Sequence, residues 1–278
     1  MAIVLMAASL IGPQQLTCVE VRHFLPGGSS RPLLAGALDE AGNFQVIVLK
    51  LRHPPVADGQ PHYAGTSLAC ELICAVLARA VGLDVPDYSV VALPAGLAES
   101  VPDPRLRELL RHNPDRHFGL RFLEGIAEGP PGRSASLAAL DRLEDVLAFD
   151  ATVINGDRKA MKPNLLRQGD RIIVIDHGVA IPVHLAADDV IDSSPLFPES
   201  QVRDHCAFGV LEGSGRAYNR MLARWTAELD DAQWTELRAM IPASWERRPG
   251  DLDRIFRFLH NRGERARDIS TDLLRVMR

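Results

Sequence analysis

The chain has 278 residues, of which 46% are apolar and 24% charged, and its formal net charge is −5. These proportions are typical of a globular protein that folds without disulfide staples, and they exclude a disordered or fibrous chain. The negative charge excludes a broad basic field, so we expect no direct contact with nucleic acid.

The cysteines and the N-terminal residues bear on the cellular compartment. The four cysteines contain no CxxC pair, which favours a reducing environment, and we predict a cytoplasmic protein. Residues 1–12 form a mostly apolar run without the Lys or Arg that usually begins a signal peptide. The run is also too short to cross a bilayer. We therefore expect no membrane anchor.

Short apolar runs separated by turn residues dominate the first third of the chain. Residues 16–26 read as a strand, and residues 32–52 read as two more strands around the turn Asp-Glu-Ala-Gly-Asn. A helix is expected over residues 66–81, because Gly82 follows as a helix terminator, and residues 85–94 again read as a strand.

From residue 94 the pattern changes, because apolar residues now recur at three- and four-residue intervals. The expected helices cover residues 102–113, 139–154, 204–229, 230–241 and 249–262. Residues 164–178 read as one short hairpin among them. We predict an α+β protein of two lobes: a small antiparallel sheet with one helix in residues 1–93, and a mostly helical part in residues 94–278.

Three polar residues of the second part are suited to phosphoryl transfer. Asp157 lies in a polar loop after a predicted helix, Asn164 follows seven residues later, and Asp176 ends the apolar strand Ile-Ile-Val-Ile. Phosphoryl transfer requires a carboxylate that positions the acceptor hydroxyl and hard oxygen ligands for Mg²⁺. Together the three residues offer one catalytic acid and two magnesium ligands.

The first part of the chain supplies groups for the phosphates of ATP. Lys50 closes the apolar strand Val-Ile-Val-Leu, and Glu71 stands near the start of the next helix. A strand lysine held by a helix glutamate is the arrangement that kinases use on nucleotide phosphates. Backbone N–H groups to cover the phosphates are offered by a turn of Gly27, Gly28, Ser29 and Ser30.

Each of these residues, taken alone, has a simpler explanation. A Gly-Gly-Ser-Ser turn is common in hairpin loops, a lysine at a strand end usually reaches solvent, and Asp176 could be a turn former. The joint order of loop, strand Lys, helix Glu, Asp, Asn and strand-end Asp is what favours a phosphoryl-transfer site.

The same segments resemble the HipA-like kinase family, in particular its compact branch. The phosphate loop and lysine strand of that branch are similar to residues 27–50, and its lysine-pairing helix and the strand into the hinge are similar to residues 67–93. Its catalytic and metal motifs resemble residues 155–180, NGDRKAMKPNLLRQGDRIIVIDHGVA, and its closing helices resemble residues 241–264.

The resemblance implies a bilobal, protein-kinase-like fold and a set of residue roles. Asp157 would be the catalytic aspartate and Asp176 the principal magnesium ligand. Lys50 would contact the nucleotide phosphates, with Glu71 as its partner. The further implied contacts are Asn164 at the metal, and Val91 and Leu93 beside the nucleotide.

Lys162 departs from the family pattern. Protein kinases place a metal-binding Asn five residues after the catalytic Asp, and here that position is Lys162. Of an Asn-Pro-Asn pattern the chain keeps only the second Asn, Asn164. A lysine in part of the metal site would leave an enzyme weak or inactive.

We predict an ATP- and Mg²⁺-dependent kinase that phosphorylates a Ser or Thr hydroxyl on a protein substrate and, as a further hypothesis, its own loop at Ser29 or Ser30. A small-molecule or lipid kinase stays open as an alternative, as does a nucleotide-binding pseudokinase or interaction module. An antitoxin-like protein is a further partner to consider. We expect neither nucleic acid nor membrane as a direct partner.

Overall fold

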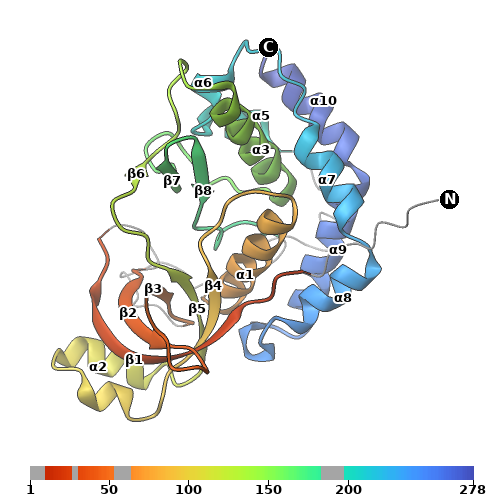
Figure 1. Ribbon diagram of the computed structural model, residues 1–278. Helices are drawn as coiled ribbons and strands as arrows, with labels where there is room; N and C mark the ends of the chain where they lie inside the picture. Colours follow the sequence, from red (N-terminus) through yellow and green to blue (C-terminus); the bar gives the residue numbers. More distant parts are fainter. Residues whose placement is uncertain (1–9, 27–30, 53–63, 183–196) are drawn as a thin grey trace.

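The computed structural model describes residues 10–26, 31–52, 64–182 and 197–278, and the strands of its first part close into a barrel (Figure 1). Around the barrel the strand order is β1-β2-β3-β5-β4. The strands are β1 (Gln14–Phe24), β2 (Leu33–Leu38), β3 (Phe44–Lys50), β4 (Tyr88–Ala92) and β5 (Arg116–Arg121).

The barrel differs in two ways from the small antiparallel sheet predicted from the sequence. First, β1 and β4 pair in parallel, with Gln14 opposite Ser89 and Thr17 opposite Ala92, and this pairing closes the barrel. Second, β5 pairs with both β3 and β4, although the sequence analysis assigned its residues to the helical part. Alternating apolar residues identify strands but do not identify their distant partners, so neither pairing is visible in the sequence. The division of the chain at residue 93 stays a prediction.

The turn between β2 and β3 forms as the sequence predicts. The side chain of Asp39 accepts the backbone N–H of Asn43 at 2.8 Å, and Gly42 has a φ of 83°. Glycine adopts this left-handed conformation without a steric penalty, so the turn is short and the two strands stay in register. Lys50 is the last residue of β3, at the end of the strand away from this turn.

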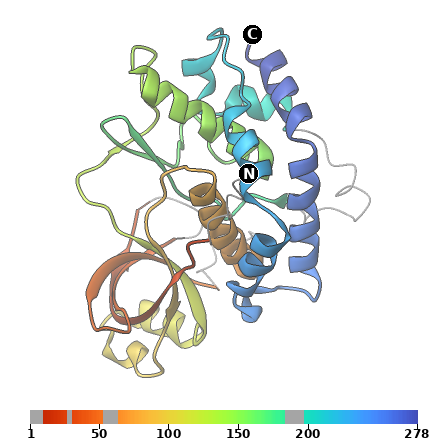
Figure 2. The same cartoon turned by 45° about the vertical axis from the view of Figure 1, so that its right-hand side comes forward.

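Helix α1 (Ala64–Ala80) lies between the barrel and the helices of the second part, as both views show (Figures 1 and 2). Its described side chains are buried on nearly every face of the helix, so its apolar residues are not confined to one side. They share one core cluster with Tyr88 of β4, Phe118 of β5 and Trp225. The helix is therefore held from both sides.

Helix α3 (Leu137–Val153) packs against α7 (Arg220–Glu228), α9 (Asp251–Glu264) and α10 (Ala266–Val276). Two helices, η1 (Leu97–Ser100) and α2 (Pro104–Arg111), lie against the barrel instead (Figure 1). The remaining helices are α5 (Glu199–Asp204), α6 (Phe208–Leu211), α8 (Asp231–Ala239) and η3 (Ala243–Trp245). The single helix predicted over residues 204–229 is wrong, because Gly213 and Gly215 adopt positive φ and separate α6 from α7. Within the described part of the chain, no helix has both the length and the apolar character needed to cross a bilayer.

Arg262 of α9 fixes the C-terminal end of α3. Its buried guanidinium donates to the carbonyl oxygens of Thr152 at 3.0 Å and of Ala151 at 2.7 Å. These carbonyls lack helical partners at a helix end, so the arginine satisfies them. Ile154 then turns the chain out of the helix with a φ of 52°. The loop that contains Asp157 begins from this anchored point.

The predicted hairpin forms as β7 (Leu165–Gln168) and β8 (Arg171–Val174), and β6 (Ala127–Glu128) adds a third strand beside β7. Asp84, between α1 and β4, accepts the backbone N–H of Val174 at 2.9 Å. This bond ties the end of β8 to the first part of the chain, two residues before Asp176.

Replacing Trp225 of α7 with alanine should destabilise the whole core. Its side chain is buried and its ring lies 6.1 Å from Phe149 and 6.2 Å from Trp234. We expect Trp225→Ala to lower the free energy of unfolding by about 3–5 kcal/mol, because the truncation leaves a large cavity. Urea unfolding followed by circular dichroism measures the change. Leu137→Ala, at a side chain that is exposed on α3, is the control and should change it by less than about 0.5 kcal/mol; equal losses would contradict this description of the core.

Candidate active site

A buried lysine joins three separate elements at the centre of the molecule. Lys50, the last residue of β3, donates its ammonium group to Glu71 Oε1 of α1 and to Asp176 Oδ1 at 2.6 Å, just beyond β8. Lys50 is 7% exposed and Glu71 is 2% exposed. The structure therefore brings together the strand lysine, the helix glutamate and the strand-end aspartate that the sequence analysis selected.

The charges of this cluster stabilise one another. Burial alone would lower the pKa of Lys50, but the carboxylates of Asp176 and Glu71 outweigh it and raise the pKa above its ordinary value. Burial likewise opposes ionisation of Asp176, yet the ammonium groups of Lys50 and Lys162 hold its pKa well below the usual range. Lys50 and Asp176 are consequently charged at neutral pH.

The residues after Asp176 fix its orientation. Asp176 has a φ of 62°, a left-handed conformation that is uncommon for a residue with a side chain and that often marks a functional site. The next backbone N–H, that of His177, donates to Glu71 Oε2 at 3.0 Å. A Cβ atom on Gly178 would come within 2.8 Å of Glu71 Oε1, so only glycine leaves room for this carboxylate.

The buried carboxylate of Asp150 accepts hydrogen bonds from three side chains. Asp150 lies at the end of α3 and accepts from Arg158 Nε, from Asn155 Nδ2 at 2.9 Å and from His205 Nε2 at 3.0 Å. His205 Nδ1 accepts the N–H of Ala207, so the proton of this imidazole is on Nε2. Burial disfavours the charged form, but Arg158 above all keeps the pKa of Asp150 far below its usual range.

Arg158 connects the loop to the hairpin. Its Nη1 donates to the carbonyl oxygens of Asn164 and Ile175, the latter at 3.3 Å, and its Nη2 donates to His177 Nε2 at 2.9 Å. Burial, and then the charge of Arg158, lowers the pKa of His177 to about 3, so this imidazole is neutral and can accept the bond. One guanidinium thus sets the spacing between the loop of Asp157 and the segment of Asp176.

Sequence reasoning missed Asp150, Arg158 and His205 as parts of this site. Asp150 is 8 residues from Arg158 and 55 residues from His205, so no local spacing reveals the contacts. The available signal was the arginine directly after Asp157, because a buried arginine requires a buried acid.

Asp157 and Asp176 meet through Lys162. The ammonium group of Lys162 lies 2.5 Å from Asp157 Oδ2 and 3.3 Å from Asp176 Oδ2. Burial lowers the pKa of Lys162, but the two carboxylates outweigh this and raise it above its ordinary value. Lys162 is therefore a positive charge between the two acids, at the position where the resemblance implies an asparagine.

A cleft of about 590 Å³ opens beside this cluster. Its charged and amide lining residues are Lys50, Arg121, Glu124, Glu128, Lys162, Asn164 and Asp176. Its apolar lining comes from Leu25, Pro26, Pro32, Val48, Leu120, Phe122, Leu123, Ile126, Leu166 and Ile175. A cleft that combines apolar walls with several charged side chains is suited to a planar, charged ligand.

The predicted phosphate-loop residues Gly27, Gly28, Ser29 and Ser30 lie outside the described residues. The residues on both sides of them are described, and Leu25, Pro26 and Pro32 line the cleft.

Val91 and Leu93, which the resemblance placed beside the nucleotide, do not line the cleft. Both are buried in the second core cluster of the barrel, together with residues of η1 and α2. The segment that borders the cleft is 121–126, which follows β5. The chain leaves β4 through η1 and α2 and returns along β5, so the strand that reaches the cleft is one strand later than expected.

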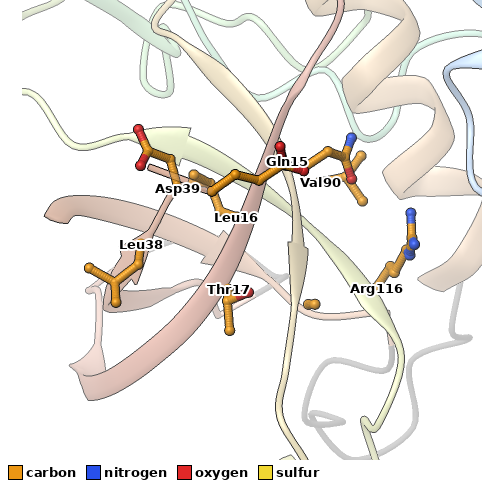
Figure 3. A pocket seen from close by; sticks show the side chains of 9 residues that line it. Gln15, Leu16, Thr17, Leu38, Asp39, Val90 and Arg116 are labelled. Atoms are coloured by element: carbon orange, nitrogen blue, oxygen red, sulfur yellow. The ribbon is translucent and has the colours of Figure 1, made fainter. Parts of the chain in front are cut away.

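A second cavity of about 450 Å³ is bordered by the first residues of β1, the turn that follows β2, and residues of β4 and β5 (Figure 3). Figure 3 shows the side chains of Asp39 and Arg116 extending from opposite sides of it, with Gln15 of β1 between them. None of its described lining residues is among the predicted site residues. We therefore assign the chemistry to the first cleft.

Known kinases resemble this chain in sequence pattern and in fold. A family model described as HipA-like kinase matches residues 56–262, more than half of the chain. The crystal structure of the proinflammatory kinase CtkA from Helicobacter pylori aligns over 94% of this chain and 96% of its own, with a TM-score of 0.50 and 12% identity. This likeness shows that the present chain has a kinase-like α+β fold. A Golgi casein kinase with Mn/ADP bound aligns over 96% of this chain and 74% of its own, with a TM-score of 0.46 and 14% identity. None of the curated proteins matches the chain.

Replacing Arg158 with methionine should destabilise the protein strongly. The variant leaves the carboxylate of Asp150 buried without its main counter-charge, so we expect Arg158→Met to lower the free energy of unfolding by about 3–5 kcal/mol. Arg171→Met is the control, because Arg171 makes an exposed ion pair with Asp84 at 3.0 Å that is worth less than about 1 kcal/mol. Chemical denaturation measures the free energy of unfolding of both variants. Equal losses would show that the buried bonds of Arg158 do not stabilise the site more than an exposed ion pair does.

Proposed function

Because the chain belongs to the HipA-like kinase family, we propose that it transfers the γ-phosphoryl group of ATP, with Mg²⁺, to a serine or threonine hydroxyl of a protein. One observation carries the proposal. The ammonium group of Lys50 bonds to both Glu71 and Asp176, and Lys162 links Asp176 to Asp157. These are the positions that kinases use for the phosphates, the metal and the acceptor.

The cleft supports a nucleotide as the ligand. Its volume of about 590 Å³ is within the range of small-molecule sites, which is roughly 300–1,000 Å³. The apolar walls suit the adenine ring, and the segment 121–126 borders the cleft. Lys50 at the polar end is placed to neutralise phosphate oxygens.

Asp176 and Asn164 are the residues that fit a hard divalent cation. Both line the cleft, and the buried Nδ2 of Asn164 has no hydrogen-bond partner in the part of the chain that the structure describes. Among the described residues no group of three or more His, Cys, Asp or Glu side chains forms a metal cage, in keeping with Mg²⁺ sites that use one or two carboxylates plus substrate phosphates. When bound, the metal ion would neutralise charge on the phosphates.

Asp157 is the residue that would orient the acceptor hydroxyl. Its side chain is 31% exposed and that of Lys162 is 39% exposed, so the acceptor side of the site is open to solvent. An open acceptor side accommodates the hydroxyl of a bulky protein better than that of a small metabolite, which an enclosed pocket would favour. This openness is our reason to choose a protein acceptor.

A second candidate is a protein that binds ATP without transferring phosphate. It is favoured by Lys162, whose ammonium group occupies Asp157 Oδ2 and competes with an acceptor hydroxyl for that oxygen. Both candidates share the nucleotide site, so they differ in transfer and not in binding.

Incubation with γ-labelled ATP and Mg²⁺ tests the transfer. We expect the wild type to label itself or an added protein substrate, and we expect Asp157→Asn and Asp176→Asn to reduce labelling at least about 100-fold, since each removes a group that acts on the reacting atoms. Asp170→Asn, in the exposed turn between β7 and β8, makes the same change of charge and should label like the wild type.

A thermal shift with MgATP separates the two candidates. Stabilisation of the wild type without any labelling would support the nucleotide-binding protein and contradict the kinase. Equal labelling of the wild type and of both aspartate variants would contradict the assigned roles of Asp157 and Asp176.

A further inference from the structure

Lys162 is held in place by the backbone of its own loop. Its N–H donates to the carbonyl of Lys159 at 3.1 Å, and the N–H of Lys159 donates to the carbonyl of Lys162 at 3.0 Å. The backbone of Lys159 also pairs with that of His205 in an isolated antiparallel β-bridge, and the side chain of His205 bonds to the buried Asp150. This closed turn is attached to the core, so the lysine side chain starts from a fixed point.

The two lysines change the charge balance of the site. With all five groups in their ionised forms, Glu71, Asp157 and Asp176 supply three negative charges, and Lys50 and Lys162 supply two positive charges, which leaves a formal charge of −1. With a neutral asparagine at position 162 the formal charge would be −2. Protein kinases of the two-metal type bring a second Mg²⁺ to a site of that kind.

The ammonium group also occupies the space that a second metal ion would need. In two-metal kinases the ions are held by an aspartate in the role proposed for Asp176 and by the catalytic-loop asparagine, and Lys162 would stand in the place of that asparagine. Lys162 Nζ lies 3.3 Å from Asp176 Oδ2 and 2.5 Å from Asp157 Oδ2. A divalent ion at that place would meet a positive charge at very short range, where electrostatic repulsion is strong. Asp176 keeps further lone pairs, so one metal ion can still bind there with Asn164 on the side of the cleft.

We propose that Lys162 takes the place of a second divalent cation, so that this site binds one metal ion together with the nucleotide. The inference rests on the proposed function, because it assumes that nucleotide and metal bind in the cleft. Lys162 is a positioning residue in this account: its charge holds Asp157 and Asp176 together without a second ion.

Counting bound Mn²⁺ tests the inference without relying on activity. Electron paramagnetic resonance of free Mn²⁺, in the presence of a saturating non-hydrolysable ATP analogue, gives the number of ions bound per chain. We expect about one for the wild type and about two for Lys162→Asn, which restores the neutral amide of the family pattern. Lys159→Asn is the matched control: it removes a lysine from the same loop at an exposed position and should still bind about one.

The outcomes separate the inference from the proposed function. Two bound ions in the wild type would overturn the inference and leave the proposed kinase site intact. One bound ion in Lys162→Asn, with nucleotide binding retained, would also overturn it. No bound Mn²⁺ in the wild type would overturn both the inference and the metal-dependent function.

Discussion

The buried ion pairs of Lys50 are the interaction on which the rest of the structure depends. One ammonium group at the end of β3 contacts a carboxylate from α1 and a carboxylate that follows β8. A buried charge without a partner is strongly destabilising, so the barrel, α1 and the hairpin are favoured only in the arrangement that brings all three groups together. The same arrangement creates the cleft and gives it a charged end.

A second buried pair fixes the other half of the site. Arg158 bonds to Asp150 and to backbone carbonyls on both sides of the hairpin, while Arg262 satisfies the end of α3. Asp157 follows α3 and precedes Arg158, so its position is determined by groups that never touch a substrate. Lys162 then spans the remaining distance to Asp176. Rigid support of this kind is what positions reacting groups in an enzyme.

The sequence predicted the residues whose types conflict with their local pattern. A lysine in an apolar strand and an aspartate after Ile-Ile-Val-Ile are poor choices for packing, and the structure places Lys50 and Asp176 in contact. Contacts that depend on distant partners were not predictable. The family resemblance implied that Val91 lies beside the nucleotide, but its strand β4 pairs with β5 and Val91 is buried in the core of the barrel. The pair of Asp150 and Arg158 was missed for the same reason, since only the tertiary fold buries both.

The most direct test of this account is a crystal structure of the protein soaked with ADP and Mn²⁺, with the metal located by its anomalous scattering. The account predicts adenine in the cleft beside segment 121–126, a phosphate oxygen in contact with Lys50, and Mn²⁺ coordinated by Asp176. Nucleotide bound elsewhere, or Mn²⁺ without Asp176 as a ligand, would contradict it.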